Sequence, residues 1–121
     1  MDTNTAIGAL SALALANRLE VFRLLVKAGP EGMAAGDIAR ATDARPNTLS
    51  ANLNVLSGAG LVRSQRQGRS IVYRADYERM RDLLAFLVED CCGGDASICA
   101  PLAEIASRAA CCEPSDGRSL L

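Results

Sequence analysis

GDIARATDARPNTLSANLNVLSGAGLVRSQRQGRSIVYR, residues 36–74, is the segment on which the architecture of this chain depends. Its first half predicts two short helices joined by a tight turn at TDAR, residues 42–45. The second helix begins at Pro46, because proline lacks an amide hydrogen and fits the first turn of a helix. The GAG sequence at residues 58–60 ends it. The segment therefore opens with a helix-turn-helix pattern.

The second of these helices has two faces of different character. Apolar residues recur at the spacing of one helical face, which indicates a buried side. These residues are Leu49, Leu53 and Leu56. The other side carries small and mostly polar residues, which are Asn47, Thr48, Ser50, Ala51 and Asn52.

β-prone residues follow this helix in two short runs, Leu61-Val62 and Ile71-Val72-Tyr73. RSQRQGRS lies between them, with a glycine at the place of a hairpin turn. The predicted fold class is mainly α with a small two-stranded antiparallel β-hairpin. It is a winged helix-turn-helix with the element order α-α-α-α-β-β-α.

The N-terminal segment TAIGALSALALANRLEVFRLLVKAGP, residues 5–30, predicts two helices. In the first, three apolar residues share a face, namely Leu10, Leu13 and Ala14. Asn17 and Glu20 have the spacing of a capping box at the start of the second helix. Gly29-Pro30 ends that helix.

The C-terminal segment begins with a fifth helix over residues 76–92, for which Asp76 is the expected cap. Its apolar stripe consists of Met80, Leu83, Leu84, Leu87 and Val88. We place a winged helix-turn-helix domain at residues 1–92. Residues 93–121 form a cysteine-containing C-terminal segment, with a short predicted helix at residues 100–112 and then a loose tail.

Composition and charge narrow the class of protein. The chain has 121 residues, a length that suits one small domain. It contains no histidine. Its N-terminus lacks the basic region of a secretion signal, and no apolar run approaches a membrane span, so we expect a cytoplasmic protein without membrane contact. Residues 40–74 contain six arginines and one acid, a net charge of +5. This basic segment is either a contact surface for a polyanion or a solvated face.

Residues 13–75 resemble the ArsR/SmtB family of bacterial winged-helix metalloregulators. LALANRLEVFRLLVKAGPEG, the segment quoted first and the long helix after it carry the resemblance. NLNVLSGAGLV, residues 52–62, is similar to HLKVLREAGLV, which is typical of the family, with Asn52 in place of histidine. The resemblance implies a homodimeric repressor whose first and last helices form the dimer, so residues 1–92 would be a DNA-binding and dimerisation domain. The helix at residues 46–57 would enter the major groove, and the hairpin would be the wing.

DNA contacts follow from this arrangement. Small polar side chains on an exposed helix can bond base edges, and arginines on a hairpin can hold phosphates or a narrow minor groove. We expect groove contacts from Asn47, Thr48, Ser50 and Asn52. We expect backbone contacts from Arg45, Arg66 and Arg69, while some arginines are only solvated. A two-fold dimer predicts an operator that is an imperfect palindrome, with half-sites about one helical turn apart.

All five cysteines lie between residues 91 and 112. In a reducing cytosol, clustered thiols indicate metal-binding, catalytic or redox roles more often than structural disulfides. Cys91 and Cys92 are adjacent, so their Cα atoms are about 3.8 Å apart, too close for an ordinary disulfide. Cys99 follows after a glycine-containing turn. Three thiolates without nitrogen or oxygen donors suit a soft, thiophilic centre.

The cysteine arrangement resembles that of the arsenic-responsive ArsR repressors with a C-terminal site. The family's cysteine site before the recognition helix is absent, because Met33 to Ile38 carry no cysteine. The family's other site, on the last helix, uses histidines and is absent too, because the chain has no histidine. We therefore expect As(III), and also Sb(III), as an inducer bound by Cys91, Cys92 and Cys99. Cys111 and Cys112 are alternative ligands, a second site, a transfer site or dispensable thiols.

The expected function is a repressor that leaves its operator when the metalloid binds. A thiol-based redox sensor of the same fold is the alternative, and a cadmium, lead or zinc thiolate site also remains open. We do not expect an enzyme, because the chain has neither a Cys-x-x-Cys motif nor a histidine to act as a base.

Overall fold

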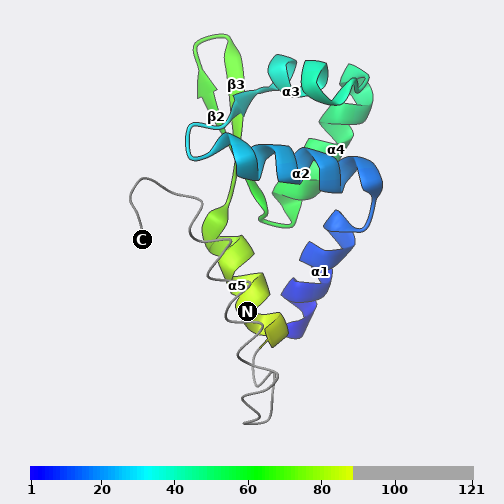
Figure 1. Cartoon of the computed structure of the whole chain (residues 1–121), viewed down its shortest axis with the longest axis vertical. Coiled ribbons are helices and arrows are strands. Elements are labelled where there is room, and N and C mark those ends of the chain that lie inside the picture. Colours follow the sequence, from blue (N-terminus) through cyan, green and yellow to red (C-terminus); the bar gives the residue numbers. More distant parts are fainter. Residues whose placement is uncertain (89–121) are drawn as a thin grey trace. The chain divides into compact units, whose positions relative to one another are not determined.

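A computed structural model describes residues 1–88 of the chain. The described elements are α1 (Thr3–Leu13), α2 (Ala16–Ala28), β1 (Met33–Ala34), α3 (Ala35–Thr42), α4 (Pro46–Gly58), β2 (Val62–Gln67), β3 (Ser70–Ala75) and α5 (Tyr77–Val88). Residues Met1–Phe86 form one compact unit. Within it, α2, α3 and α4 pack together beside the hairpin, and α1 and the start of α5 lie at the end remote from the hairpin tip (Figure 1). The predicted winged helix-turn-helix is confirmed.

The sheet has a third strand that the sequence did not indicate. Its order is β1-β3-β2, with all neighbours antiparallel, and Met33 pairs with Tyr73. Met33 lies on β1 and not on the helix that follows it, because the chain before α3 is extended. Gly32 has φ 72°, and a Cβ there would lie 2.3 Å from the Tyr73 carbonyl oxygen. Only glycine lets the loop approach β3 this closely, so tertiary pairing creates β1.

The hairpin turn follows its prediction. Gln67 pairs with Ser70, so a two-residue loop of Gly68 and Arg69 joins β2 to β3. Gly68 has φ 63°. Glycine at the first loop position is the signature of a type II′ turn, whose twist suits antiparallel strands.

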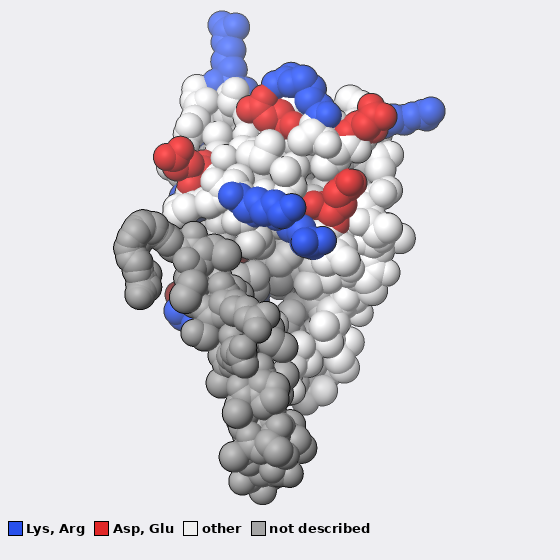
Figure 2. Space-filling view, viewed as in Figure 1, with Lys and Arg blue, Asp and Glu red and all other residues white. Residues whose placement is uncertain are grey.

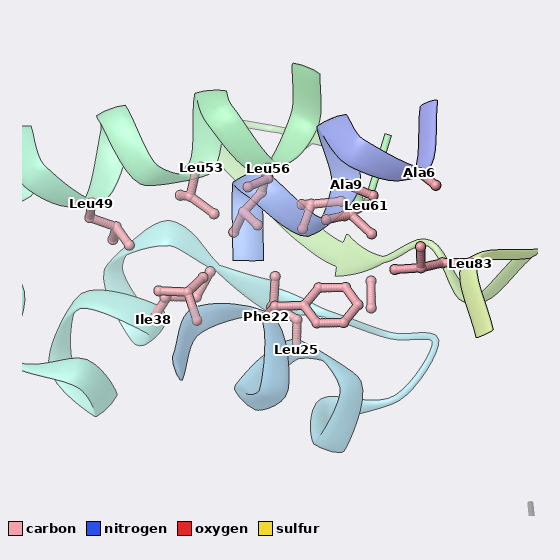
Figure 3. Close-up of a cluster of buried hydrophobic side chains, with 14 residues drawn as sticks. Ala6, Ala9, Phe22, Leu25, Ile38, Leu49, Leu53, Leu56, Leu61 and Leu83 are labelled. Carbon is pink, nitrogen blue, oxygen red and sulfur yellow. The ribbon is translucent and has the colours of Figure 1, made fainter. Parts of the chain in front are cut away.

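The core forms where α4 meets α2 and α3. Figure 3 shows the α4 leucines directed towards side chains of the other helices. Leu49, Leu53 and Leu56 are all buried, as their spacing predicted. Their partners across the core are Phe22, Leu25 and Ile38. This packing holds α4 by one face and leaves its other face to solvent.

The buried face of α1 differs from our expectation. Alanines line it, namely Ala6, Ala9 and Ala12, while Leu10 is 41% exposed. Small side chains with i, i+3, i+6 spacing let α1 approach its neighbours closely and turn the larger residues outward.

The junction between α1 and α2 also differs. Asn17 is not the cap of α2, because the helix begins at Ala16 after an extended Leu15. Arg18 instead ends α1: its Nε donates to the Ala12 carbonyl oxygen at 2.7 Å. A cation at this position satisfies a free carbonyl at a helix C-terminus.

Helix α5 begins as predicted, and part of its apolar stripe is exposed. The Arg79 backbone amide donates to Asp76 Oδ1 at 3.0 Å, which is an N-terminal cap. Leu83 is buried, but Leu84, Leu87 and Val88 are exposed. The predicted domain boundary at residue 92 and the short helix after it lie outside the described residues. No helix among residues 1–88 is long and apolar enough to span a bilayer.

Candidate nucleic-acid interface

A short turn sets the direction of α4 relative to α3. Asp43 adopts φ 54°, a left-handed conformation that Asn and Asp tolerate better than most residues. The Ala44 amide donates to the Ala39 carbonyl oxygen and closes the end of α3. Arg45 is extended, and Pro46 occupies the first turn of α4. The chain therefore reverses within three residues, as the TDAR sequence predicted.

The outward face of α4 carries most of the predicted groove residues. Asn47, Thr48 and Ser50 are all exposed. Ala51 and Asn54 are exposed as well. The leucines of α4 make its contacts with the core. The small side chains on the other face are therefore free to offer their hydrogen-bond donors and acceptors to a partner.

Asn52 is the exception, and its expected contact with DNA bases is corrected by the structure. Its side chain is buried, with 6% of its surface exposed. Asn52 follows Leu49 by three residues and precedes Leu56 by four, so helical geometry puts it on the leucine side. Within residues 1–88, its side chain takes part in no hydrogen bond.

The predicted backbone-binding arginines all lie at the surface. Arg45 stands at the N-terminal end of α4, Arg66 lies on β2, and Arg69 is in the hairpin turn. All three are exposed. Figure 2 shows basic side chains projecting from the end of the unit that bears the wing and α3, with acidic side chains among them. Arg40 on α3 pairs with Asp37 of the same helix and is partly neutralised.

The base of the wing is tied to the start of α5 by one carboxylate. Arg63 Nε donates to Asp76 Oδ2 at 2.7 Å, and the Asp76 amide donates to the Leu61 carbonyl oxygen at 2.8 Å. Partial burial of Asp76 opposes its ionisation. The Arg79 amide and the Arg63 guanidinium outweigh that effect and hold the pKa of Asp76 below its usual value. The wing is thus anchored to the helix that follows it.

Known proteins with this fold identify the family. The sequence profile of a helix-turn-helix domain matches residues 8–65. A solution structure from Mycobacterium bovis is 31% identical, has a TM-score of 0.57, and aligns over 72% of this chain and 81% of that one. It is the homodimeric winged helix-turn-helix DNA-binding domain of a possible ArsR-family transcriptional regulator. The chain belongs to the ArsR family.

Two further structures resemble this ArsR-family chain. An ArsR-like transcriptional regulator from Rhodococcus sp. RHA1 is 27% identical with a TM-score of 0.63, covering 87% of this chain and 92% of that chain. HlyU from Vibrio cholerae is 25% identical with a TM-score of 0.57, covering 72% and 97%, and a structure of reduced HlyU has the same fold. No curated protein sequence matches the chain.

The predicted thiol site of this ArsR-family protein lies outside the described residues. Cys91, Cys92 and Cys99, like Cys111 and Cys112, all follow Val88. Among residues 1–88, no group of three or more His, Cys, Asp or Glu side chains is placed to hold a metal ion. The ligand roles of these cysteines stay a prediction.

Two features of this ArsR-family interface escaped the sequence reasoning. Asn54 is exposed on α4 and was not among the expected groove residues, although its spacing of seven residues from Asn47 was visible. Arg63 and Arg74 face each other directly across the hairpin, and only the strand register reveals this pairing. Arg63 has a carboxylate partner in Asp76, which offsets the repulsion between the two arginines.

Proposed function

We propose that this ArsR-family chain is a homodimeric repressor that binds operator DNA and releases it when As(III) or Sb(III) binds its cysteines. The observation that carries the DNA-binding part is the outward polar face of α4 beside an arginine-bearing hairpin. A helix held by its leucines and free on its polar side has the form that enters a major groove.

The contacts divide by chemistry. Asn47, Thr48 and Ser50 would bond base edges, because they are small, exposed and mixed donors and acceptors. The arginines would hold phosphates and set the register of the protein on the duplex. These are Arg45, Arg66 and Arg69. The burial of Asn52 removes that residue from the proposal.

Dimerisation is proposed through apolar residues that the described unit leaves exposed on α1 and α5. Ile7 on α1 and Leu84 on α5 are each 54% exposed, and Leu10 on α1 is exposed as well. A contiguous exposed apolar patch marks an association surface, and α1 and α5 lie at the same end of the unit (Figure 1). The Mycobacterium bovis neighbour is homodimeric. Two-fold symmetry would match an operator that is an imperfect palindrome.

The inducer is proposed from the chemistry of the donor set. Cys91, Cys92 and Cys99 supply three soft sulfur donors within nine residues and no competing histidine. Such a set favours As(III) or Sb(III) over hard cations. If the inducer-bound dimer fits the operator less well, DNA affinity falls, and DNA must weaken inducer binding by the same factor. A typical coupling of about 1–3 kcal/mol corresponds to roughly 5- to 150-fold.

The test is operator binding by reduced protein, measured by fluorescence anisotropy with and without arsenite. We expect arsenite to weaken binding about 5- to 150-fold for the wild type. Cys91→Ser, Cys92→Ser and Cys99→Ser should each abolish this response while leaving binding without arsenite unchanged. Cys111→Ser and Cys112→Ser serve as matched controls and should respond like the wild type. Loss of the response only in those two controls would overturn the assignment.

A redox sensor of the same fold is the second candidate, because all five thiols are clustered and a structural neighbour, HlyU, has been solved in a reduced form. Oxidation would join Cys99 to another thiol and alter operator binding. Peroxide distinguishes the two candidates. If peroxide abolishes operator binding and arsenite does not, the redox sensor replaces the metalloid sensor.

A further inference from the structure

Two asparagines on α4 stand two residues apart and have opposite environments. Asn52 is buried against the leucine side, whereas Asn54 is exposed. Within residues 1–88, no hydrogen bond engages the Asn54 side chain. Its amide therefore keeps both a donor and an acceptor free for an external partner.

Asn54 completes a single outward row on α4. The row consists of Asn47, Ser50, Ala51 and Asn54, which are all exposed. Their spacing is i, i+3, i+4, i+7, so the four side chains lie on one face of the helix. The recognition helix of homeodomains uses residues at this same spacing to reach base edges in the major groove. The opposite face of α4 is held by Leu49, Leu53 and Leu56 in the core.

The chemistry of this row favours a particular base. An asparagine amide can bond adenine at N6 and N7 simultaneously, and no other base pair offers that pattern in the major groove. Ala51 beside it carries a methyl group that suits the thymine methyl. The row therefore combines amides for adenine with an apolar contact for thymine.

We infer that Asn54 is a specificity-determining residue that recognises an adenine in each operator half-site. This inference rests on the proposed operator binding and adds a residue and a base to it. Asn54 does so because its amide stands on the outward row, one helical turn beyond Ala51. Asn52 does not take part, because its amide is enclosed by the core.

The experiment first recovers the preferred duplex for the wild-type protein from a randomised DNA pool. Asn54→Ala is then measured against that duplex and against variants with each base pair changed. We expect a loss of about 5- to 150-fold on the preferred duplex, together with relaxed discrimination at one adenine per half-site. Asn17→Ala is the matched control, since Asn17 is an exposed asparagine on α2. It should bind like the wild type.

Replacing that adenine with 7-deazaadenine removes the N7 acceptor without changing the base pair. The wild type should lose affinity for the modified duplex, whereas Asn54→Ala should bind both duplexes equally. Equal losses for the two proteins, or an Asn54→Ala variant with unchanged specificity, would overturn the role of Asn54. If the wild type recovers no preferred sequence at all, the proposed operator binding fails instead. Circular dichroism confirms that Asn54→Ala is folded.

Discussion

At the scale of single residues, the buried amide of Asn52 is the least expected feature. A buried amide that lacks a hydrogen-bond partner costs about 1–3 kcal/mol. Asn52 is buried on the side of α4 that carries Leu49, Leu53 and Leu56, and its side chain takes part in no hydrogen bond within residues 1–88. We therefore expect Asn52 to reduce the stability of the fold around α4.

We predict that Asn52→Leu stabilises the protein. Leucine branches at Cγ as asparagine does and has no polar group to desolvate, so the free energy of unfolding should rise by about 1 kcal/mol. Urea titration followed by circular dichroism measures this change. Asn54→Leu is the control, and its free energy of unfolding should match the wild type because the side chain is in solvent. A less stable Asn52→Leu variant would mean that the amide is satisfied or that the core cannot accept leucine.

At the scale of elements, the junction between β3 and α5 joins the wing to the last helix. Asp76 accepts from the Arg79 amide as a cap and from the Arg63 side chain of β2. Tyr77, the next residue, donates its hydroxyl to the Val26 carbonyl oxygen of α2 at 3.0 Å. Asp76 and Tyr77 therefore connect β2, α2 and α5. A rotation of α5 would strain its bonds to both the wing and α2.

The lowered pKa of Asp76 predicts a pH-dependent contribution to stability. The ionised carboxylate is favoured in the folded state, so its contribution is present above the unfolded pKa of about 3.9. It is lost as the pH falls through the lower folded pKa. At pH 7, Asp76→Ala should reduce the free energy of unfolding by about 1 kcal/mol, the usual value of an N-terminal cap.

Urea titrations at pH 7 and pH 3 measure this effect, and the gap between wild type and Asp76→Ala should narrow at pH 3. Asp82→Ala is the matched control, because Asp82 is an exposed acid on the same helix. A gap of the same size at both pH values would show that the charge of Asp76 does not stabilise the fold.

At the scale of the whole molecule, charge and apolar surface are separated along the sequence. The arginine-rich residues 40–74 contain the turn, α4 and the hairpin, while α1 and α5 carry exposed leucines and isoleucine. Counterion release makes DNA binding by such a basic surface strongly dependent on salt. The apolar surface, by contrast, responds little to salt and is the proposed surface of association between copies.

We predict that Leu84→Glu dissociates the proposed dimer. Burying a carboxylate from each copy should raise the dimer dissociation constant about 100-fold or more, because neither charge has a partner. Analytical ultracentrifugation measures the change. Val55→Glu introduces the same charge at an exposed apolar residue of α4 and should remain dimeric. A dimeric Leu84→Glu variant would place the association surface elsewhere.

The sequence predicted features that depend on local periodicity. The leucine spacing of α4, the proline at its start and the glycine of the hairpin turn are all local signals, and the structure confirms them. The sequence did not reveal β1, because two residues are too few to show an alternation of apolar and polar side chains. These residues form a strand only because they pair with β3, where Met33 lies opposite Tyr73. The orientation of Asn52 was missed because a border position on a helix is settled by the packing of neighbouring helices. The roles of the cysteines stay predictions.

The sheet order has a practical consequence for experiments on the wing. Among the described strands, β2 pairs on one side only, with β3, so its other edge presents free backbone groups. Such edges invite strands of other copies, and charged side chains along them oppose aggregation. Arg63 and Arg66 lie on this strand. Substituting them with alanine to weaken DNA binding would also increase the tendency of β2 to pair with strands of other copies. Arginine-to-lysine changes keep the charge that opposes pairing at this edge, so they test only the contribution of the planar guanidinium to DNA binding.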